Sequence, residues 1–315
     1  MSKIQIGISS CLLGEEVRYN GGHKRSNICT DQLQKYFEYT PLCPEISIGL
    51  GVPRKPIRLV GDPTNPRAVG SDDASFDVTD KLKSFAEKTL PALHSISGYI
   101  FVKGSPSCGV SRVKVYLDNG MPAAEHGSGI YSKMVMDKYP LLPVEEAGRL
   151  NDPILKENFI TRVFAHHHWQ QLVKEGLSAK KVLEFHRDYK FLLMAHSPIE
   201  CSRLGRLLAD ALSIDLDKVA NEYIASFMKA LNGHATRKSN SNVLMHLQGY
   251  LKKQLLKKQK ESLAESIEHY RKGLLPIIVP ITLLKSHFNS FPNKYVETQR
   301  FLSPYPEELC LRNRI

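Results

Sequence analysis

The sequence predicts an α/β domain with a doubly wound, mainly parallel sheet, followed by an all-α domain. Strand-like and helix-like segments alternate in the first half, which is typical of a parallel sheet with crossover helices. From residue 182 onward, nearly every segment shows apolar residues at helical spacings of three and four. We place the first domain at residues 1–150, a helical bridge at 151–184 and the second domain at 185–315.

The first half contains two apolar runs that read as buried strands, Ile4–Ser9 and Gly98–Lys103. Between and after them, three segments have helical patterns: Asp31–Tyr39, Asp80–Leu93 with Thr79 as its N-cap, and Tyr131–Lys138. The proline-rich stretch before Thr79 is expected to be irregular.

The rest of the chain is expected to be helical. Residues 145–183, around and within the bridge, are expected to provide three short pieces: Glu145–Leu150, Pro153–Phe164 and Trp169–Leu172. The second domain provides five longer helices: Val182–Met194, Ile199–Ala211, Leu216–Leu231, Val243–Gly273 and Ile281–Phe288. Turns at Gly233–Asn242 and Pro292–Asn293 separate some of them.

Composition indicates a soluble globular protein, with 42% hydrophobic and 24% charged residues among 315. The N-terminus lacks the basic-then-apolar layout of a secretory signal. The longest late apolar stretch, Gly273 to Leu284, is far shorter than the roughly 20 residues that span a bilayer. We therefore expect a cytoplasmic protein without a membrane partner, while its oligomeric state stays open.

The net charge of +11 is unevenly distributed. Residues 1–150 carry 18 Lys and Arg against 16 Asp and Glu, a net of +2. Residues 151–315 carry 25 against 16, a net of +9. This split suggests chemistry in the first part and binding of a polyanion in the second, although a solvated lysine-rich surface gives the same numbers.

Three of the six cysteines fall where a parallel sheet would bring them together. Cys11 and Cys108 follow the two predicted strands, and Cys43 lies in a proline-bracketed loop after a short extended run. Loops at the carboxyl ends of parallel strands converge on one crevice. Glu45, Ser105 and Ser107 would reach the same crevice.

Such a trio of thiols without a fourth suggests a 4Fe–4S cluster with one iron not bound by cysteine. Two other interpretations remain open. In the first, each cysteine is a small buried hydrophobic residue at the end of a strand. In the second, Cys108 alone is a nucleophile, activated by the backbone amides of a glycine-rich turn. No CxxC pair is present, and a reducing cytosol excludes a disulfide framework. We expect the other three to be packing residues: Cys29, Cys201 and Cys310.

Several motifs in the first half resemble those of the thiouracil desulfidase family. They appear in the family's order: Ser9-Ser10-Cys11-Leu12-Leu13-Gly14, Cys43-Pro44-Glu45, Gly51-Val52-Pro53-Arg54, Ile57-Arg58-Leu59-Val60-Gly61 and Lys103-Gly104-Ser105-Pro106-Ser107-Cys108-Gly109. The second half resembles the YbgA-type domain of unknown function. The residues that carry this second resemblance are Phe185-His186, Tyr189-Lys190, His196, Tyr270-Arg271-Lys272-Gly273, Pro276, Val279-Pro280 and Pro304-Tyr305-Pro306. Together the two modules resemble tRNA 4-thiouridine desulfidases.

The resemblance implies a 4Fe–4S cluster held by Cys11, Cys43 and Cys108, with Glu45 and Ser105 as catalytic residues. Ser107 is the alternative serine. The implied reaction replaces C=S by C=O in 4-thiouridine of tRNA and releases sulfide, with Glu45 activating water as general base. A desulfidase of free thiouracil or thiouridine, and a non-enzymatic nucleic-acid adaptor, are the alternatives. The sequence does not separate a 2-thio from a 4-thio substrate.

The cationic residues of the proline-rich stretch can be interpreted in two ways. Arg54, Lys55, Arg58 and Arg67 either contact phosphate or base at the crevice mouth, or pair with nearby aspartates. His166, His167 and His168 point in different directions on a helix, so we expect packing there and not metal binding.

The second domain carries the residues expected to bind RNA. They belong to a turn rich in cations and hydroxyls, a lysine-rich helix in which Lys253, Lys257 and Lys260 align, and a cationic group on an earlier helix. The predicted RNA-binding residues are Arg187, Lys190, Arg237, Lys238, Lys253 and Lys257.

Overall fold

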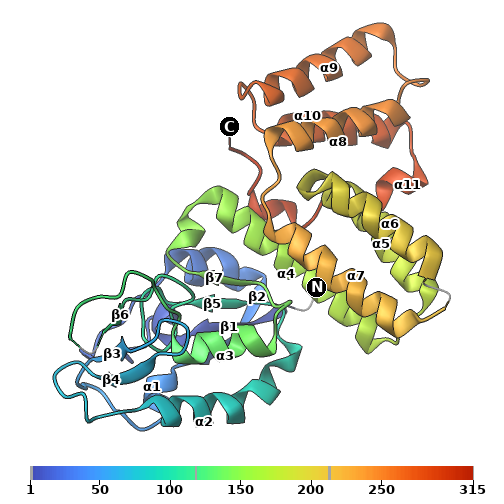
Figure 1. Cartoon of the computed structure of the whole chain (residues 1–315). Coiled ribbons are helices and arrows are strands. Elements are labelled where there is room, and N and C mark those ends of the chain that lie inside the picture. The colour runs from blue at the N-terminus through green and yellow to red at the C-terminus, as the bar shows by residue number, and fades with distance from the viewer. Residues whose placement is uncertain (1–2, 118, 212–213, 315) are drawn as a thin grey trace. The chain divides into compact units, whose positions relative to one another are not determined.

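The computed structural model describes residues 3–117, 119–211 and 214–314. The chain forms two compact units, residues 1–155 and 156–315 (Figure 1). The first unit combines sheets with helices and the second is helix-rich, so the predicted fold class is confirmed.

The main sheet of the first unit has four strands, all parallel, in the order β2-β1-β5-β7. Their bounds are Ile4–Ser9 for β1, Phe37–Leu42 for β2, Tyr99–Phe101 for β5 and Val144–Glu146 for β7. Because β1, β2 and β5 run in the same direction as neighbours, the loops after them leave from one edge. That edge carries the three cysteine segments.

A second, three-stranded sheet was not expected from the sequence. It has the order β4-β3-β6, with β3 at Ile57–Val60, β4 at Arg67–Gly70 and β6 at Val115–Tyr116. The prolines around these short strands hide the alternating pattern from which strands are predicted. In the structure, Leu59 and Val115 are buried together in a separate small hydrophobic core. The proline-rich stretch is therefore ordered.

Three α-helices complete the first unit: α1 at Pro44–Ser47, α2 at Thr79–Thr89 and α3 at Ile130–Lys138. Figure 1 shows α2 and α3 side by side on one face of the main sheet, where Tyr131 of α3 packs edge-on against Tyr99 and Phe101. Thr79 is not the N-cap of α2. Its hydroxyl instead accepts a hydrogen bond from the Ala68 amide at 2.8 Å.

Two predicted helices of the first half are wrong. Residues 31–39 form the end of a π-turn, a 3₁₀ turn (Leu33–Lys35) and the start of β2, because Phe37 and the residues after it pair with β1. Residues 145–150 contribute to β7 and a 3₁₀ turn, because Val144–Glu146 pairs with β5. In both places, strand pairing with distant residues decides the local structure.

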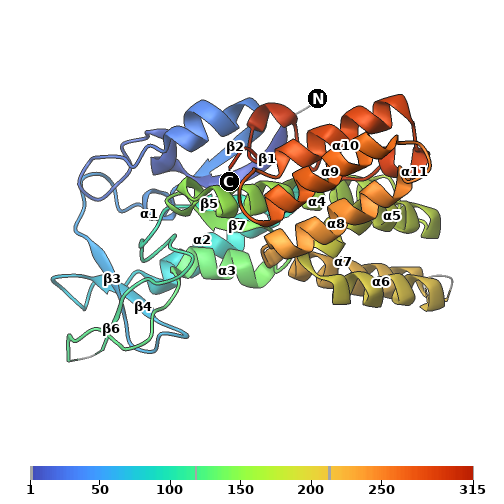
Figure 2. The same cartoon turned by 90° about the horizontal axis from the view of Figure 1, so that it is seen from above.

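The second unit consists of helices joined by short connections. In chain order they are α4 (Pro153–Lys174, starting just before the unit), α5 (Ala179–His196), α6 (Pro198–Ala211), α7 (Leu216–Asn232), α8 (Arg237–Tyr250), α9 (Lys257–Arg271), α10 (Ile278–Ser290) and α11 (Lys294–Glu297). Figure 2 shows α8, α9 and α10 lying together. Among the described residues, no helix is long and apolar enough to cross a membrane.

The single helix predicted over Val243–Gly273 is two helices. The chain turns after α8, and a new helix begins at Lys257; the amide of the preceding residue, Leu256, donates a hydrogen bond to the Gln259 side chain at 2.9 Å. The predicted row of Lys253, Lys257 and Lys260 is therefore wrong, because Lys253 lies in the turn. The start of the second helix is fixed by a side-chain cap, which apolar spacing does not reveal.

An aromatic core holds the second unit together. Phe185 stacks on Tyr189 at 4.4 Å between ring centroids, and Trp169 meets Phe185 edge-on at 5.1 Å. His168 packs against both Phe185 and Tyr189. The packing role predicted for the histidine run is therefore found at His168.

Candidate iron–sulfur site

Cys11, Cys43 and Cys108 line one cavity of about 510 Å³. Cys11 lies in the turn directly after β1, Cys43 directly follows β2, and Cys108 lies within the loop between β5 and β6. The parallel sheet thus brings together three thiols that are far apart in sequence.

Burial controls the electrostatics of these thiols. It raises the pKa of Cys11 to about 11, with the neighbouring Cys43 adding to the effect, and it raises the pKa of Cys43. For Cys108, burial and then the nearby Glu45 and Cys43 raise the pKa well above the usual range. A free nucleophile needs a lowered pKa, so this setting disfavours Cys108 as a lone nucleophile. Binding to iron would deprotonate the thiols outright.

The donor set suits a cluster better than a single ion. In the part of the chain that the structure describes, no three His, Cys, Asp or Glu side chains are arranged to hold one metal ion. In a 4Fe–4S cluster each cysteine binds a different iron, so the sulfur atoms must surround a cavity and not a point. The described cavity lining includes three cysteines but no fourth cysteine and no histidine. The residues present therefore fit a cluster bound by Cys11, Cys43 and Cys108.

Glu45 lies in the same cavity and is held by Arg54. The guanidinium donates from Nε at 2.9 Å and from Nη2 at 2.7 Å, and both bonds go to Oε2 of the carboxylate. The other oxygen, Oε1, accepts a hydrogen bond from the Ser107 hydroxyl at 2.9 Å and a long one from Ser105 at 3.5 Å. Arg54 therefore lines the cavity and pairs with a glutamate, and not with one of the nearby aspartates.

The two serines have different positions. Ser105 lines the cavity, and its hydroxyl accepts hydrogen bonds from the amides of Ser107 and Cys108, each at 3.1 Å. Ser107 is completely buried behind it. The loop packs so closely that a Cβ on Gly129 would lie 2.5 Å from the Ser107 carbonyl carbon, so only glycine fits there. Ser105 is consequently the serine that a bound molecule would meet.

The cavity is lined by more cations than acids. Besides Arg54 and the single carboxylate of Glu45, its lining contains Arg18, Arg58, Lys103, Arg112 and Lys114. Arg58 stacks over the Tyr116 ring at 5.3 Å, and its buried Nε has no hydrogen-bond partner among the described residues. Arg67 lies outside the lining and pairs with Asp77 at 3.4 Å.

Comparison with known proteins assigns both halves. The family model "2-thiouracil desulfurase" matches residues 6–147, and "Protein of unknown function (DUF1722)" matches residues 190–306. An uncharacterised protein, YbgA of Escherichia coli K12, is 30% identical over 158 residues, which cover 50% of this chain and 94% of YbgA. The chain joins a 2-thiouracil desulfurase domain to a DUF1722 domain, and it belongs to both families.

Two further similarities concern parts of the chain. An uncharacterised protein, YbbK of Bacillus subtilis 168, is 35% identical over 111 residues, covering 32% of this chain and 71% of YbbK. A solved structure of the [4Fe-4S]-dependent thiouracil desulfidase TudS is 28% identical, with a TM-score of 0.37, and the match covers 48% of this chain and 95% of that one.

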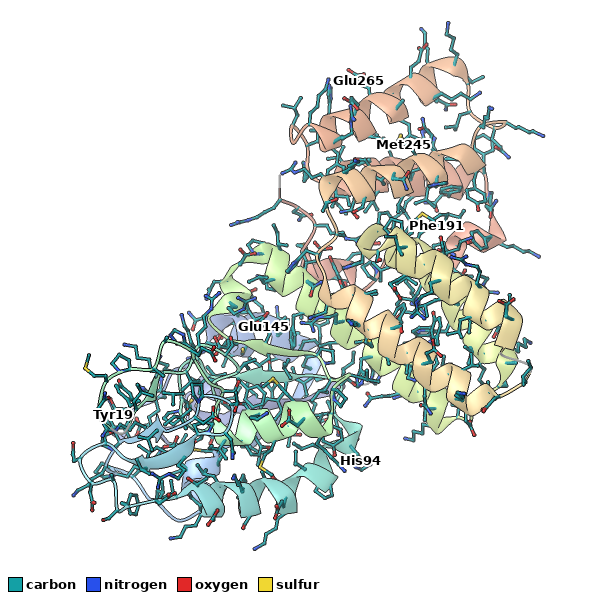
Figure 3. All side chains as sticks on the ribbon, in the orientation of Figure 1. Tyr19, His94, Glu145, Phe191, Met245 and Glu265 are labelled. Atoms are coloured by element: carbon teal, nitrogen blue, oxygen red, sulfur yellow. The ribbon has the colours of Figure 1, made fainter. Side chains whose placement is uncertain are left out.

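The desulfurase domain contains one important residue whose role the sequence did not reveal. Arg54 was expected to contact phosphate or base at the crevice mouth or to pair with an aspartate, and its pairing with Glu45 was not predicted. The only signal was its place in the Gly51-Val52-Pro53-Arg54 motif, because the partner lies on a different loop. The Tyr19 carbonyl accepts a hydrogen bond from the Arg54 amide at 2.8 Å, and in Figure 3 Tyr19 lies away from the main sheet, to which Glu145 belongs.

The predicted RNA-binding residues of the DUF1722 domain lie on several elements. Arg187 pairs with Asp188 at 2.9 Å, and Lys257 lies 4.0 Å from Glu261. Arg237 and Lys238 begin α8, whereas Lys253 follows its other end, about 20 Å away for a 14-residue helix. Lys190 is exposed on α5.

Proposed function

We propose that the chain is an iron–sulfur desulfidase that converts 4-thiouridine in tRNA to uridine and releases sulfide. One observation carries the proposal: three cysteines from three separate loops line one cavity together with Glu45 and Ser105. The 2-thiouracil desulfurase domain supports the reaction class. The relative named TudS is described as [4Fe-4S]-dependent, which agrees with the donor set found here.

Cys11, Cys43 and Cys108 would hold the cluster in this mechanism. A bound cluster with one iron not bound by cysteine would supply a Lewis acid and a soft acceptor for the sulfur of the base. The net reaction consumes one water, replaces C=S by C=O and releases hydrogen sulfide, so no electrons are transferred.

The protein's own groups handle the water and the protons. Glu45 would accept a proton from the attacking water at Oε1, the oxygen that Arg54 leaves free. Ser105 lies next to that oxygen in the cavity wall and would orient the water or the pyrimidine ring. Ser107 holds the carboxylate from behind.

The DUF1722 domain is proposed to bind the tRNA. Its half of the chain carries a net charge of +9, and several lysines in it are exposed, including Lys190, Lys238 and Lys253. Neutralisation of phosphates by such side chains is the main source of affinity for nucleic acids. The cytoplasm, where tRNA is found, is the proposed location.

The test is a desulfuration assay on anaerobically prepared, iron-loaded protein. We expect thiolated tRNA to lose its thiocarbonyl absorbance and release an equal amount of sulfide, faster than free 4-thiouridine or thiouracil at the same concentration. Cys43→Ala serves as the inactive control. Preference for the free base or nucleoside would support the alternative of a small-molecule desulfidase, and no sulfide from any substrate would refute both.

A further inference from the structure

We propose that Arg54 is a positioning residue of the desulfurase cavity, which fixes the rotation of the Glu45 carboxylate so that Oε1 faces the serines and the substrate. This inference rests on the proposed desulfidase function. It assigns to Arg54 a role in the reaction although the residue itself needs to touch neither cluster nor substrate.

The asymmetry of the ion pair is the main evidence. In the common bidentate arrangement, an arginine donates one N–H to each carboxylate oxygen and engages both. Here Nε and Nη2 both donate to Oε2, at 2.9 and 2.7 Å. Oε1 is left for the hydroxyls of Ser107 and Ser105, at 2.9 and 3.5 Å. The carboxylate therefore has one oxygen held by the guanidinium and one directed to the cavity wall.

Arg54 is itself fixed from several sides. Nη1 donates to the Gly51 carbonyl at 2.9 Å, and Nη2 donates to the Val17 carbonyl at 3.0 Å. The side chain is only 6% exposed. Because the three nitrogens of the planar guanidinium all donate to fixed acceptors, Arg54 can adopt only one orientation. A lysine ammonium at this place would be a point charge and would not fix the orientation of the Glu45 carboxylate.

The same contacts connect the three cysteine segments. Val17 belongs to the loop that follows Cys11, and its carbonyl also accepts from the Cys43 thiol at 3.9 Å. Glu45 follows Cys43 closely, and Ser107 directly precedes Cys108. The chain of bonds from Val17 through Arg54 and Glu45 to Ser107 thus runs across all three loops. A purely structural role for Arg54 is the rival explanation, and the two differ in what happens to bound iron.

The experiment compares Arg54→Ala, Arg54→Lys and Arg67→Ala in the full-length, anaerobically prepared protein. Arg67→Ala is the matched control, because Arg67 is an exposed arginine of the same unit that pairs with Asp77 outside the cavity. For each variant, iron per chain, kcat and KM for desulfuration are measured, with and without added guanidinium ion.

We expect Arg54→Ala to retain iron and KM close to wild type while kcat falls roughly 100-fold, the size of effect that a misplaced catalytic group produces. Guanidinium ion should restore part of the lost kcat of Arg54→Ala and leave Arg67→Ala unchanged. Arg54→Lys should remain as slow as Arg54→Ala, since it restores the charge but not the geometry.

Loss of iron from Arg54→Ala would overturn the positioning role and favour the structural one. Wild-type kcat in Arg54→Ala or Arg54→Lys, or no response of Arg54→Ala to guanidinium, would also overturn it. These results are distinct from failure of the proposed function, in which the iron-loaded wild-type protein itself releases no sulfide.

Discussion

In each unit, the described residues include an arginine–glutamate pair whose guanidinium is almost fully covered, and the pair of the first unit lies at the candidate active site. Arg54 and Glu45 are 6% and 14% exposed, and Arg312 and Glu157 are 8% and 28% exposed, with 2.7 Å between charged atoms in both pairs. The two pairs differ in their surroundings. Glu45 has an oxygen that meets hydroxyls in a cavity with three thiols, whereas Glu157 accepts from Arg312 and from the Tyr305 hydroxyl through the same oxygen.

The Arg312–Glu157 pair holds the C-terminal segment in place, and we call it the C-terminal clamp. Arg312 lies over the rings of Phe301 and Tyr305, at 5.3 and 5.9 Å, and it also donates to the Phe301 carbonyl. Its partner Glu157 is on α4, so the pair ties the C-terminal segment to the first helix of the unit. A buried ion pair alone therefore does not mark a functional site, and the groups around it decide.

The largest expected effect concerns the cysteines. Replacing Cys11, Cys43 or Cys108 by Ala should abolish bound iron, because each thiol is one of only three in the described cavity lining. Replacing Cys29, Cys201 or Cys310 should leave iron per chain at the wild-type level. Iron analysis of the anaerobically purified variants checks this. Iron loss in Cys201→Ala combined with retention in Cys43→Ala would show that the ligand assignment is wrong.

The two glutamates provide the next comparison. Glu45→Gln keeps the side chain's shape but removes the base, so iron should stay and kcat should fall by about 10²–10⁴-fold. Glu157→Gln should leave kcat near wild type and lower the stability of the second unit. Measuring iron, turnover and unfolding on the same samples checks both variants. Equal turnover of Glu45→Gln and wild type would remove Glu45 from the mechanism.

The next prediction compares the contributions of a covered and an exposed ion pair of the second unit to the free energy of unfolding. Arg312→Ala removes a buried guanidinium and leaves the partly covered Glu157 without its cation, so the free energy of unfolding should fall by about 3 kcal/mol. Arg271→Ala breaks an exposed pair with Glu268 and should leave the unfolding midpoint unchanged. Urea unfolding followed by circular dichroism compares the two. Similar midpoints for both variants would contradict the clamp.

The smallest expected effect concerns tRNA affinity. Charge reversal at Lys238, Lys253 and Lys257 should weaken binding and reduce the steepness of its salt dependence by about 0.7–0.9 for each lost phosphate contact. Arg237 is left intact because it contacts the Tyr270 carbonyl and ring. Turnover of free 4-thiouridine should not change. Charge reversal at the exposed Lys81 and Lys88 of the first unit is the control, and an equal loss of tRNA affinity there would refute binding by the second domain.

Sequence reasoning succeeded where local pattern decides structure. The strand Ile4–Ser9 has its predicted bounds because alternating isoleucines fill a largely buried strand, where Ile6 and Ile8 are inaccessible to solvent. The helix predicted at Leu216–Leu231 is found at Leu216–Asn232, with a regular apolar face. These elements depend on their own residues.

Contacts between residues far apart in the chain account for the features that were not predicted from the sequence. Phe37–Leu42 is a strand because it pairs with β1, and Thr79 bonds the Ala68 amide in place of capping its helix. The pairing of Arg54 with Glu45 joins two loops whose separation in space only the folded chain defines. The motifs that resemble the desulfidase family indicated which residues matter but not which of them touch.

The most direct test of the account is the iron and acid-labile sulfide content of the anaerobically purified wild-type protein, recorded with its optical spectrum. Three cysteines around one cavity predict about four iron and four sulfide per chain, with a broad charge-transfer absorption that Cys43→Ala lacks. A colourless wild-type protein that stays free of iron after anaerobic reconstitution would contradict the assignment of Cys11, Cys43 and Cys108 as cluster ligands.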